Sequence, residues 1–161
     1  MTLILTRVTA GGVVMAADSA LTESYGNYTR ILNGAEKLLP HEPSCSCIGT
    51  WGGGVVPNPM PEGDPVPLQF VLQTFVDTAR TIQSGDQLSA KLAEWLNDNY
   101  LPAKHFIGLE VASARAASGT HDCAVYRVMN AEQVDAPPGR FRRITIRHAA
   151  RSTLTATGRS S

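Results

Sequence analysis

The sequence predicts an α+β fold in which helices cover a mainly antiparallel sheet. Three observations lead to this class. Short runs of β-branched and aliphatic residues separated by glycine turns fill the first third of the chain, two stretches with helical spacing of apolar residues follow, and another strand-like run comes after them. The length of 161 residues and the apolar content of 43% fit one domain of ordinary size with a real core.

The first predicted element is a β-hairpin at the start of the chain. Residues 3–9 and 13–17 are rich in valine, isoleucine, leucine and threonine, and Ala10-Gly11-Gly12 supplies the turn between them. Antiparallel pairing around a turn at this place brings position 18 back to position 2. We therefore expect Asp18 beside Thr2.

A polar connection and a second antiparallel pair follow the hairpin. Residues 19–30 are polar and turn-rich, with a predicted bend at Gly26-Asn27. Residues 35–39 and 44–48 are predicted to form two short paired strands, and the glycine-rich run 49–54 ends the second one. Glycines at such a place let the backbone approach a ligand closely.

Two helices and a further strand come next. Residues 55–67 hold five prolines and show no periodicity, which indicates an exposed loop. Apolar residues at helical spacing predict a helix over 68–83, and a second helix begins near Asp86, which can cap it, and ends before Pro102. Residues 105–111 are a strand candidate that rejoins the sheet.

Thr2 is the chemically distinctive residue of the sequence. Trimming of Met1 in front of a small residue leaves this threonine with a free α-amine beside its hydroxyl group. The amine has an ordinary pKa of roughly 7.7–8.0, so a fraction of it is unprotonated near neutral pH and can take the hydroxyl proton. One residue then supplies both a nucleophile and its base.

Composition excludes several classes of protein. No apolar run reaches the roughly 18 residues of a spanning helix, and the first residues lack the pattern of a secretory signal, so we expect a cytoplasmic protein without membrane contact. The three cysteines do not suggest a disulfide framework. Cys45 and Cys47 have the spacing of half a metal site, but no second ligand pair accompanies them, so buried small residues are the favoured reading.

Thr2, the run Ala16-Ala17-Asp18-Ser19, Thr22, Lys37 and Gly49 together resemble the proteasome beta-subunit family of N-terminal nucleophile (Ntn) hydrolases. The resemblance covers residues 2–111, and its most diagnostic part is the stretch from Gly12 to Thr22. Because Met1 directly precedes the threonine, the chain is most similar to the bacterial HslV-type peptidases and to the small betaproteobacterial proteasome homologues. Of these two groups, the second resembles it more.

The resemblance implies a fold and a set of roles. The fold is the Ntn-hydrolase four-layer αββα sandwich, and the activity is that of a threonine protease. Thr2 is implied as the nucleophile, with Lys37 lowering the proton affinity of the Thr2 site through its charge and Asp18 orienting the lysine. The amide of Gly49 is implied as the oxyanion donor, and the backbone of Thr22 as the partner of an extended polypeptide substrate.

The resemblance also implies partners. Family members enclose their sites in a homo-oligomeric double ring, and an ATPase unfoldase is a partner compatible with that architecture. The implied chemistry needs no metal and no dissociable cofactor, because the nucleophile, the base and the oxyanion donor all come from the chain. We expect no nucleic-acid partner.

The last part of the sequence departs from this pattern. Residues 1–110 hold six basic and eleven acidic groups, whereas residues 111–161 hold eight arginines and three acids. We divide the chain into an Ntn-like part, 1–111, and an atypical tail rich in arginine, alanine and proline, 112–161, where only Ile144-Thr145-Ile146 suggests a strand. The sandwich is therefore expected to be incomplete at its C-terminal end.

Two explanations of the tail stay open. The first is a shift of the reading frame in a GC-rich gene near residues 110–116, and the second is a genuine basic tail. A basic nucleic-acid arm is disfavoured because the tail lacks lysine, spaced aromatic residues and a binding motif. The functional alternative to an active protease is a catalytically inactive, structural or truncated proteasome-like subunit.

Overall fold

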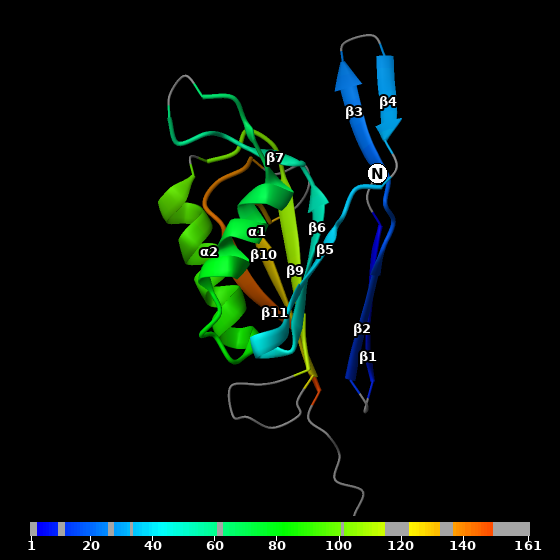
Figure 1. Ribbon diagram of the computed structural model, residues 1–161, viewed down its shortest axis with the longest axis vertical. Helices are drawn as coiled ribbons and strands as arrows, with labels where there is room; N and C mark the ends of the chain where they lie inside the picture. Colours follow the sequence, from blue (N-terminus) through cyan, green and yellow to red (C-terminus); the bar gives the residue numbers. More distant parts are fainter. Residues whose placement is uncertain are drawn as a thin grey trace, which may run out of the picture.

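The computed structural model confirms the α+β class and describes most of the chain in three layers (Figure 1). Two helices, a five-stranded antiparallel sheet and a two-stranded hairpin follow one another across the molecule. The described residues are 3–9, 12–25, 28–32, 34–60, 63–100, 102–114, 123–132 and 137–149.

The central layer is an antiparallel sheet with the strand order β11-β10-β9-β6-β5. Its inner strand β9 is buried along its whole length, because both faces of the sheet are covered at this place. The strands are β5 (Leu38–His41), β6 (Ser46–Gly52), β9 (Ile107–Ser113), β10 (Cys123–Met129) and β11 (Arg142–Ala149).

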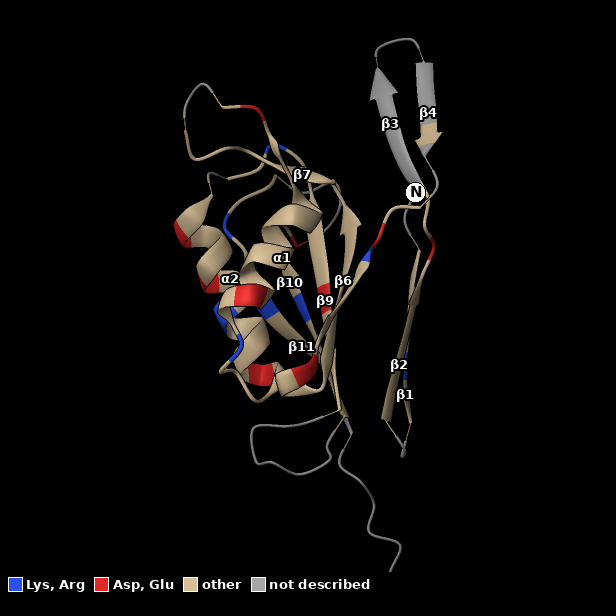
Figure 2. Cartoon of the chain, in the orientation of Figure 1, with Lys and Arg blue, Asp and Glu red and all other residues tan. Residues whose placement is uncertain are grey.

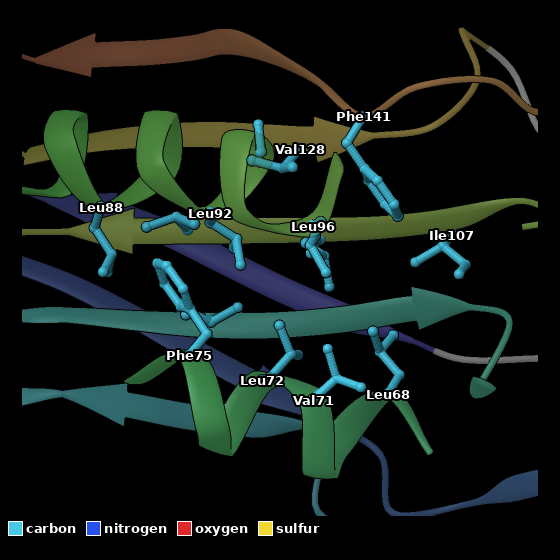
Figure 3. Packing of buried hydrophobic residues seen from close by; sticks show 14 of the residues in the cluster. Leu68, Val71, Leu72, Phe75, Leu88, Leu92, Leu96, Ile107, Val128 and Phe141 are labelled. Carbon is cyan, nitrogen blue, oxygen red and sulfur yellow. The ribbon is translucent and has the colours of Figure 1, made fainter. Parts of the chain in front are cut away.

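Helices α1 (Leu68–Thr78) and α2 (Gly85–Asn99) cover one face of this sheet. Both are amphipathic, and their apolar residues point toward the strands (Figure 3). Leu88, Leu92 and Leu96 follow one face of α2 and are almost completely buried. The burial of such side chains stabilises the layer by roughly 1.5–3 kcal/mol each.

The two helices differ from the sequence prediction at their ends. The first stops at Thr78 instead of continuing to residue 83, although Ala79 and Ile82 still pack on the core from the turn that follows. Their helical spacing therefore reflects core packing and not a helix. The second helix is capped by Ser84, whose hydroxyl accepts a hydrogen bond from the Gln87 amide at 3.3 Å, and not by Asp86.

The hairpin of β1 (Ile4–Thr9) and β2 (Gly12–Ala17) covers the opposite face of the sheet. Its residues alternate between a half-buried face toward the sheet and an exposed face. The predicted hairpin is confirmed, but its register differs by one residue. Thr9 pairs with Gly12, so Asp18 lies opposite Leu3 and not opposite position 2.

Two further pairs of strands extend from this frame. The polar stretch after β2 forms a hairpin where only a bend was predicted, and the proline-rich loop closes with two very short strands. The pairs are β3 (Leu21–Tyr25) with β4 (Tyr28–Leu32), and β7 (Val55–Val56) with β8 (Val66–Pro67). A single 3₁₀ turn, Glu42–Ser44, joins β5 to β6, so the predicted second pair of strands is confirmed with shifted bounds.

The sheet continues beyond the predicted domain boundary at residue 111. β10 and β11 both lie in residues assigned to the tail. β10 pairs with β9, and β11 pairs with β10 with a register shift between Val125 and Tyr126. The expected strand around 144–146 is confirmed as part of β11, and β10 was missed. The described domain therefore extends to residue 149, while residues 150–161 of the predicted tail lie outside the described residues.

The hairpin layer has an outer face that is largely apolar. Leu5 and Val14 are 60% and 62% exposed on it, and the ribbon of β1 and β2 is almost free of charge, in contrast to α2 (Figure 2). The described residues thus form three layers, and the four-layer Ntn sandwich stays a prediction. Within the same residues, no helix combines the length and the apolar character needed to cross a membrane.

Candidate active site

Lys37 is a buried cation at the start of β5. Only 7% of the residue is exposed. Its Nζ donates to Oδ1 of Asp18 at 2.7 Å and to the carbonyl oxygen of Ala20. A buried ammonium group is tolerated when it is paired and hydrogen-bonded in this way. The sequence-predicted pair of Asp18 and Lys37 is therefore brought together.

Asp18 connects this lysine to the first strand. Its Oδ1 also accepts a hydrogen bond from the backbone N–H of Leu3 at 3.1 Å, and its own N–H donates to the Leu3 carbonyl oxygen at 3.2 Å. The hydrogen bond from Lys37 holds the pKa of the Asp18 carboxyl below its ordinary value, and the Leu3 amide lowers it further. The carboxylate is thus ionised at neutral pH.

Of the other predicted site residues, the structure describes the backbone of Thr22 but does not describe Thr2. Thr2, the predicted nucleophile, lies outside the described residues. It directly precedes Leu3, and the Leu3 amide donates a hydrogen bond to Asp18. Thr22 lies in β3, where its backbone is paired with Ile31 of β4.

A small cleft of about 130 Å³ lies beside Lys37. One wall is the stretch that leads into β5, another is the end of β6 with its glycine turn, and the third is the start of α1. The lining residues are Ala35, Glu36, Lys37, Thr50, Trp51, Gly52, Gly53, Gly54, Pro67, Leu68 and Gln69. The site therefore offers space for a ligand next to the buried cation.

Gly49, the predicted oxyanion donor, is not among the residues that line this cleft. It lies within β6, where an added Cβ would approach Ile4 and Met15 of the hairpin to 3.0 Å. The next amide, Thr50 N–H, donates to the Lys37 carbonyl at 3.1 Å, on the β5 side. Since amides alternate along a strand, the Gly49 amide points toward β9. The glycine therefore permits close packing of the two β layers.

The glycine turn after Gly49, where the sequence predicted a close approach of backbone to a ligand, is a part of the site. Gly52 has a φ of +85°, which favours glycine, and an added Cβ there would lie 2.6 Å from the Phe106 carbonyl oxygen. The Gly53 amide donates to that same oxygen at 2.8 Å. The run of three glycines in the sequence was the signal for this turn.

A buried polar cluster between the β layers was also missed. Glu110 of β9 is 8% exposed, accepts a hydrogen bond from Thr6 of β1, and lies 3.3 Å from Nε of Arg127. Arg127 in turn lies over the ring of Trp51, 5.7 Å from its centre. The cluster fixes β1 to the sheet, and a glutamate inside a strand-like apolar run was its only sequence signal.

The cysteines are the other candidate ligands that the sequence offered. Cys45, Cys47 and Cys123 are free thiols, and burial raises the pKa of Cys47. No group of three or more histidine, cysteine or acidic side chains is placed to hold a metal in the part of the chain that the structure describes. A larger hollow of about 520 Å³ lies at the turn between β10 and β11, and neither Asp18 nor Lys37 lines it.

Comparison of the chain with models of protein families, with curated proteins and with solved structures gives no match.

Proposed function

We propose that the chain is a threonine-type endopeptidase subunit of a proteasome-like ring, with Thr2 as the nucleophile after removal of Met1. One observation carries the proposal. A single carboxylate, that of Asp18, binds the buried ammonium of Lys37 at 2.7 Å and the amide of Leu3 at 3.1 Å. A positive charge is thereby held close to the residue that follows Thr2.

The proposed reaction uses groups of the chain alone. The α-amine of Thr2 takes the proton of the hydroxyl group, and the oxygen attacks the carbonyl carbon of a peptide bond. The amine then gives its proton to the leaving amine, and water hydrolyses the resulting ester and restores the threonine. Lys37 lowers the proton affinity of the Thr2 site through its charge, and Asp18 holds the lysine in place.

The oxyanion donor belongs, in this proposal, to the amides of Gly52 and Gly54 in the glycine turn, because the Gly53 amide already donates to the Phe106 carbonyl oxygen. The Gly49 amide, the donor implied by the family resemblance, is disfavoured because it points toward β9. The turn lines the cleft beside Lys37, and its backbone can approach a substrate closely. Removal of an oxyanion donor typically costs roughly a hundred- to thousandfold in kcat.

A second candidate function is a catalytically inactive or structural proteasome-like subunit. It is favoured by the exposed apolar face of the hairpin, since Leu5 and Val14 stand uncovered by any described residue of the chain. A structural subunit would bury this apolar face against a neighbouring subunit without cleaving any substrate. The homo-oligomeric double ring, the unfoldase partner and a cytoplasmic location belong to the first proposal and need their own tests.

Labelling of the N-terminal residue tests the activity. We expect the purified chain to lack Met1 by intact mass and to form an adduct with a peptide epoxyketone on Thr2. Thr2→Ala is expected to form none, and Lys37→Gln to react more slowly, because the positive charge that lowers the proton affinity of the Thr2 site is lost. Retention of Met1, or equal labelling of Thr2→Ala, would overturn the proposal.

Light scattering after size-exclusion chromatography tests the ring. A ring subunit elutes as a closed oligomer of fixed mass over a wide range of concentrations. A stable monomer that nevertheless forms the Thr2 adduct would separate the two parts of the proposal, because it would retain the chemistry and exclude the ring.

A further inference from the structure

The cleft beside Lys37 has an unbalanced charge. The lysine itself is neutralised by Asp18, whose oxygen lies 2.7 Å from Nζ. The other ionisable residue of the lining is Glu36, which immediately precedes the lysine in the chain. The net contribution of the described charges at the cleft is therefore negative.

Glu36 is available to a ligand. The residue is exposed, and its Oε2 accepts one hydrogen bond, from Nε2 of Gln69 on α1 at 3.1 Å. Among the described side chains, no lysine, arginine or histidine forms an ion pair with it. The carboxylate accordingly keeps free acceptor positions, since an ionised carboxylate offers about four. Gln69 fixes its orientation at the rim.

The size of the cleft favours a slender side chain. A volume of about 130 Å³ corresponds to about four water molecules at about 30 Å³ each. The walls combine the apolar residues Pro67 and Leu68 with glycine backbone, and Trp51 also belongs to the lining. An alkyl stem along apolar walls with a cation at its end is the arrangement that lysine and arginine adopt elsewhere.

We infer that this cleft binds a basic side chain of a polypeptide substrate, lysine or arginine, with Glu36 as the specificity-determining residue. The inference rests on the proposed function, because it places this side chain next to the bond that Thr2 attacks. The basic residue is the one on the N-terminal side of that bond. Its stem lies along Pro67 and Leu68, and its charge meets the Glu36 carboxylate.

Cleavage of matched peptides gives the first test. Three fluorogenic peptides differ only in having arginine, leucine or aspartate before the cleaved bond. We expect kcat/KM for the arginine peptide to exceed that for the leucine peptide, and the Glu36→Gln variant to reduce this ratio about fivefold, as for a partly exposed ion pair. Glu36→Lys is expected to shift the preference toward aspartate.

The matched control is Glu42→Gln, which removes an exposed acid from the neighbouring 3₁₀ turn outside the cleft. It is expected to leave the arginine-to-leucine ratio unchanged. Cleavage of all three peptides at equal kcat/KM, or an equal drop in the ratio for Glu42→Gln, would overturn the inference and leave the proposed protease activity intact.

Binding without turnover gives the second test. In a Trp95→Phe background the fluorescence reports on Trp51, which lines the cleft. We expect a saturable change with an arginine peptide amide, a much smaller one with the neutral citrulline analogue, and loss of the difference in Glu36→Gln. Equal binding of the two peptides would contradict the inference. Because Thr2→Ala is expected to bind like the parent, failure of catalysis and failure of recognition remain distinguishable.

Discussion

The ionised carboxylate of Asp18 holds the groups of the candidate site together. Asp18 directly follows β2, and its carboxylate joins the backbone amide of Leu3, just before β1, to the ammonium of Lys37, just before β5. Side chains on two separate β layers are thus linked through one group. The position of the Leu3 backbone follows from this link.

The lowered pKa of Asp18 predicts a pH-dependent stability. The stabilising contribution is fully present above the unfolded pKa of about 3.9, and it is lost as the pH falls through the lower folded pKa. Asp18→Asn should therefore lower the urea midpoint at about pH 7, because the buried ammonium loses its partner. The difference from the parent should vanish under acid conditions where the parent carboxylate is protonated.

The control for this prediction is Asp64→Asn, since Asp64 is exposed in the loop between β7 and β8 and takes part in no ion pair among the described side chains. It is expected to change the midpoint little at either pH. A difference between Asp18→Asn and the parent that is the same at both pH values would contradict the assigned cause.

At the scale of elements, α2 and β11 are joined by one asparagine. Asn97 of α2 donates from Nδ2 to the carbonyl oxygen of Phe141 at 3.0 Å and accepts from its amide at 2.8 Å. Arg143 adds an ion pair from β11 to Asp86 at the other end of the helix. The last strand is therefore integrated into the fold, although it lies in the arginine-rich part of the sequence.

Asn97→Ala is predicted to destabilise the protein by about 1–3 kcal/mol, because two partly buried backbone groups of Phe141 lose their partners. Equilibrium urea unfolding measures the loss. Asn99→Ala on the same helix removes an exposed side-chain bond to Trp95 and is expected to stay within about 0.5 kcal/mol of the parent. Similar effects of the two substitutions would show that β11 contributes nothing through this contact.

At the scale of the whole molecule, the central sheet needs residues from both parts of the predicted division. β9 lies between β6 and β10, and α2 packs on β9, β10 and β11. Val128 on β10 and Phe141 before β11 belong to the same core as Leu92 and Leu96. The chain up to residue 111 is therefore an incomplete folding unit.

Truncation after Ser113 is predicted to abolish cooperative unfolding, because it removes two strands, exposes an edge of β9 and uncovers α2. Circular dichroism during urea titration measures this. Truncation after Ala149 retains the five strands and should retain the transition. A cooperative transition in the shorter fragment would contradict the prediction.

Resequencing of the locus separately tests the hypothesis of a shifted reading frame. An intact reading frame through this region would contradict that hypothesis.

Local sequence patterns predicted many of the strands and helices, and the elements that were not predicted have physical reasons. The β-branched and aliphatic content of residues 3–9 and 13–17 and the helical spacing after Leu68 are properties of short windows, and the structure confirms both elements. β3 and β4 are polar, so they lack the apolar alternation that marks a strand. β10 is nearly all buried and adjoins a stretch rich in arginine and alanine, which hid its boundaries.

The sequence by itself determined the fold class, the first hairpin, both helices and the residue types that carry the chemistry at positions 18 and 37. Only the tertiary structure decided that Asp18 meets Leu3 and Lys37, that Gly49 packs between layers, and that Glu36 and Gln69 border one cleft. The reason is the separation along the chain over which each kind of information acts. Periodicity acts within a few residues, whereas these contacts join residues far apart in the chain, and their geometry depends on how the layers pack.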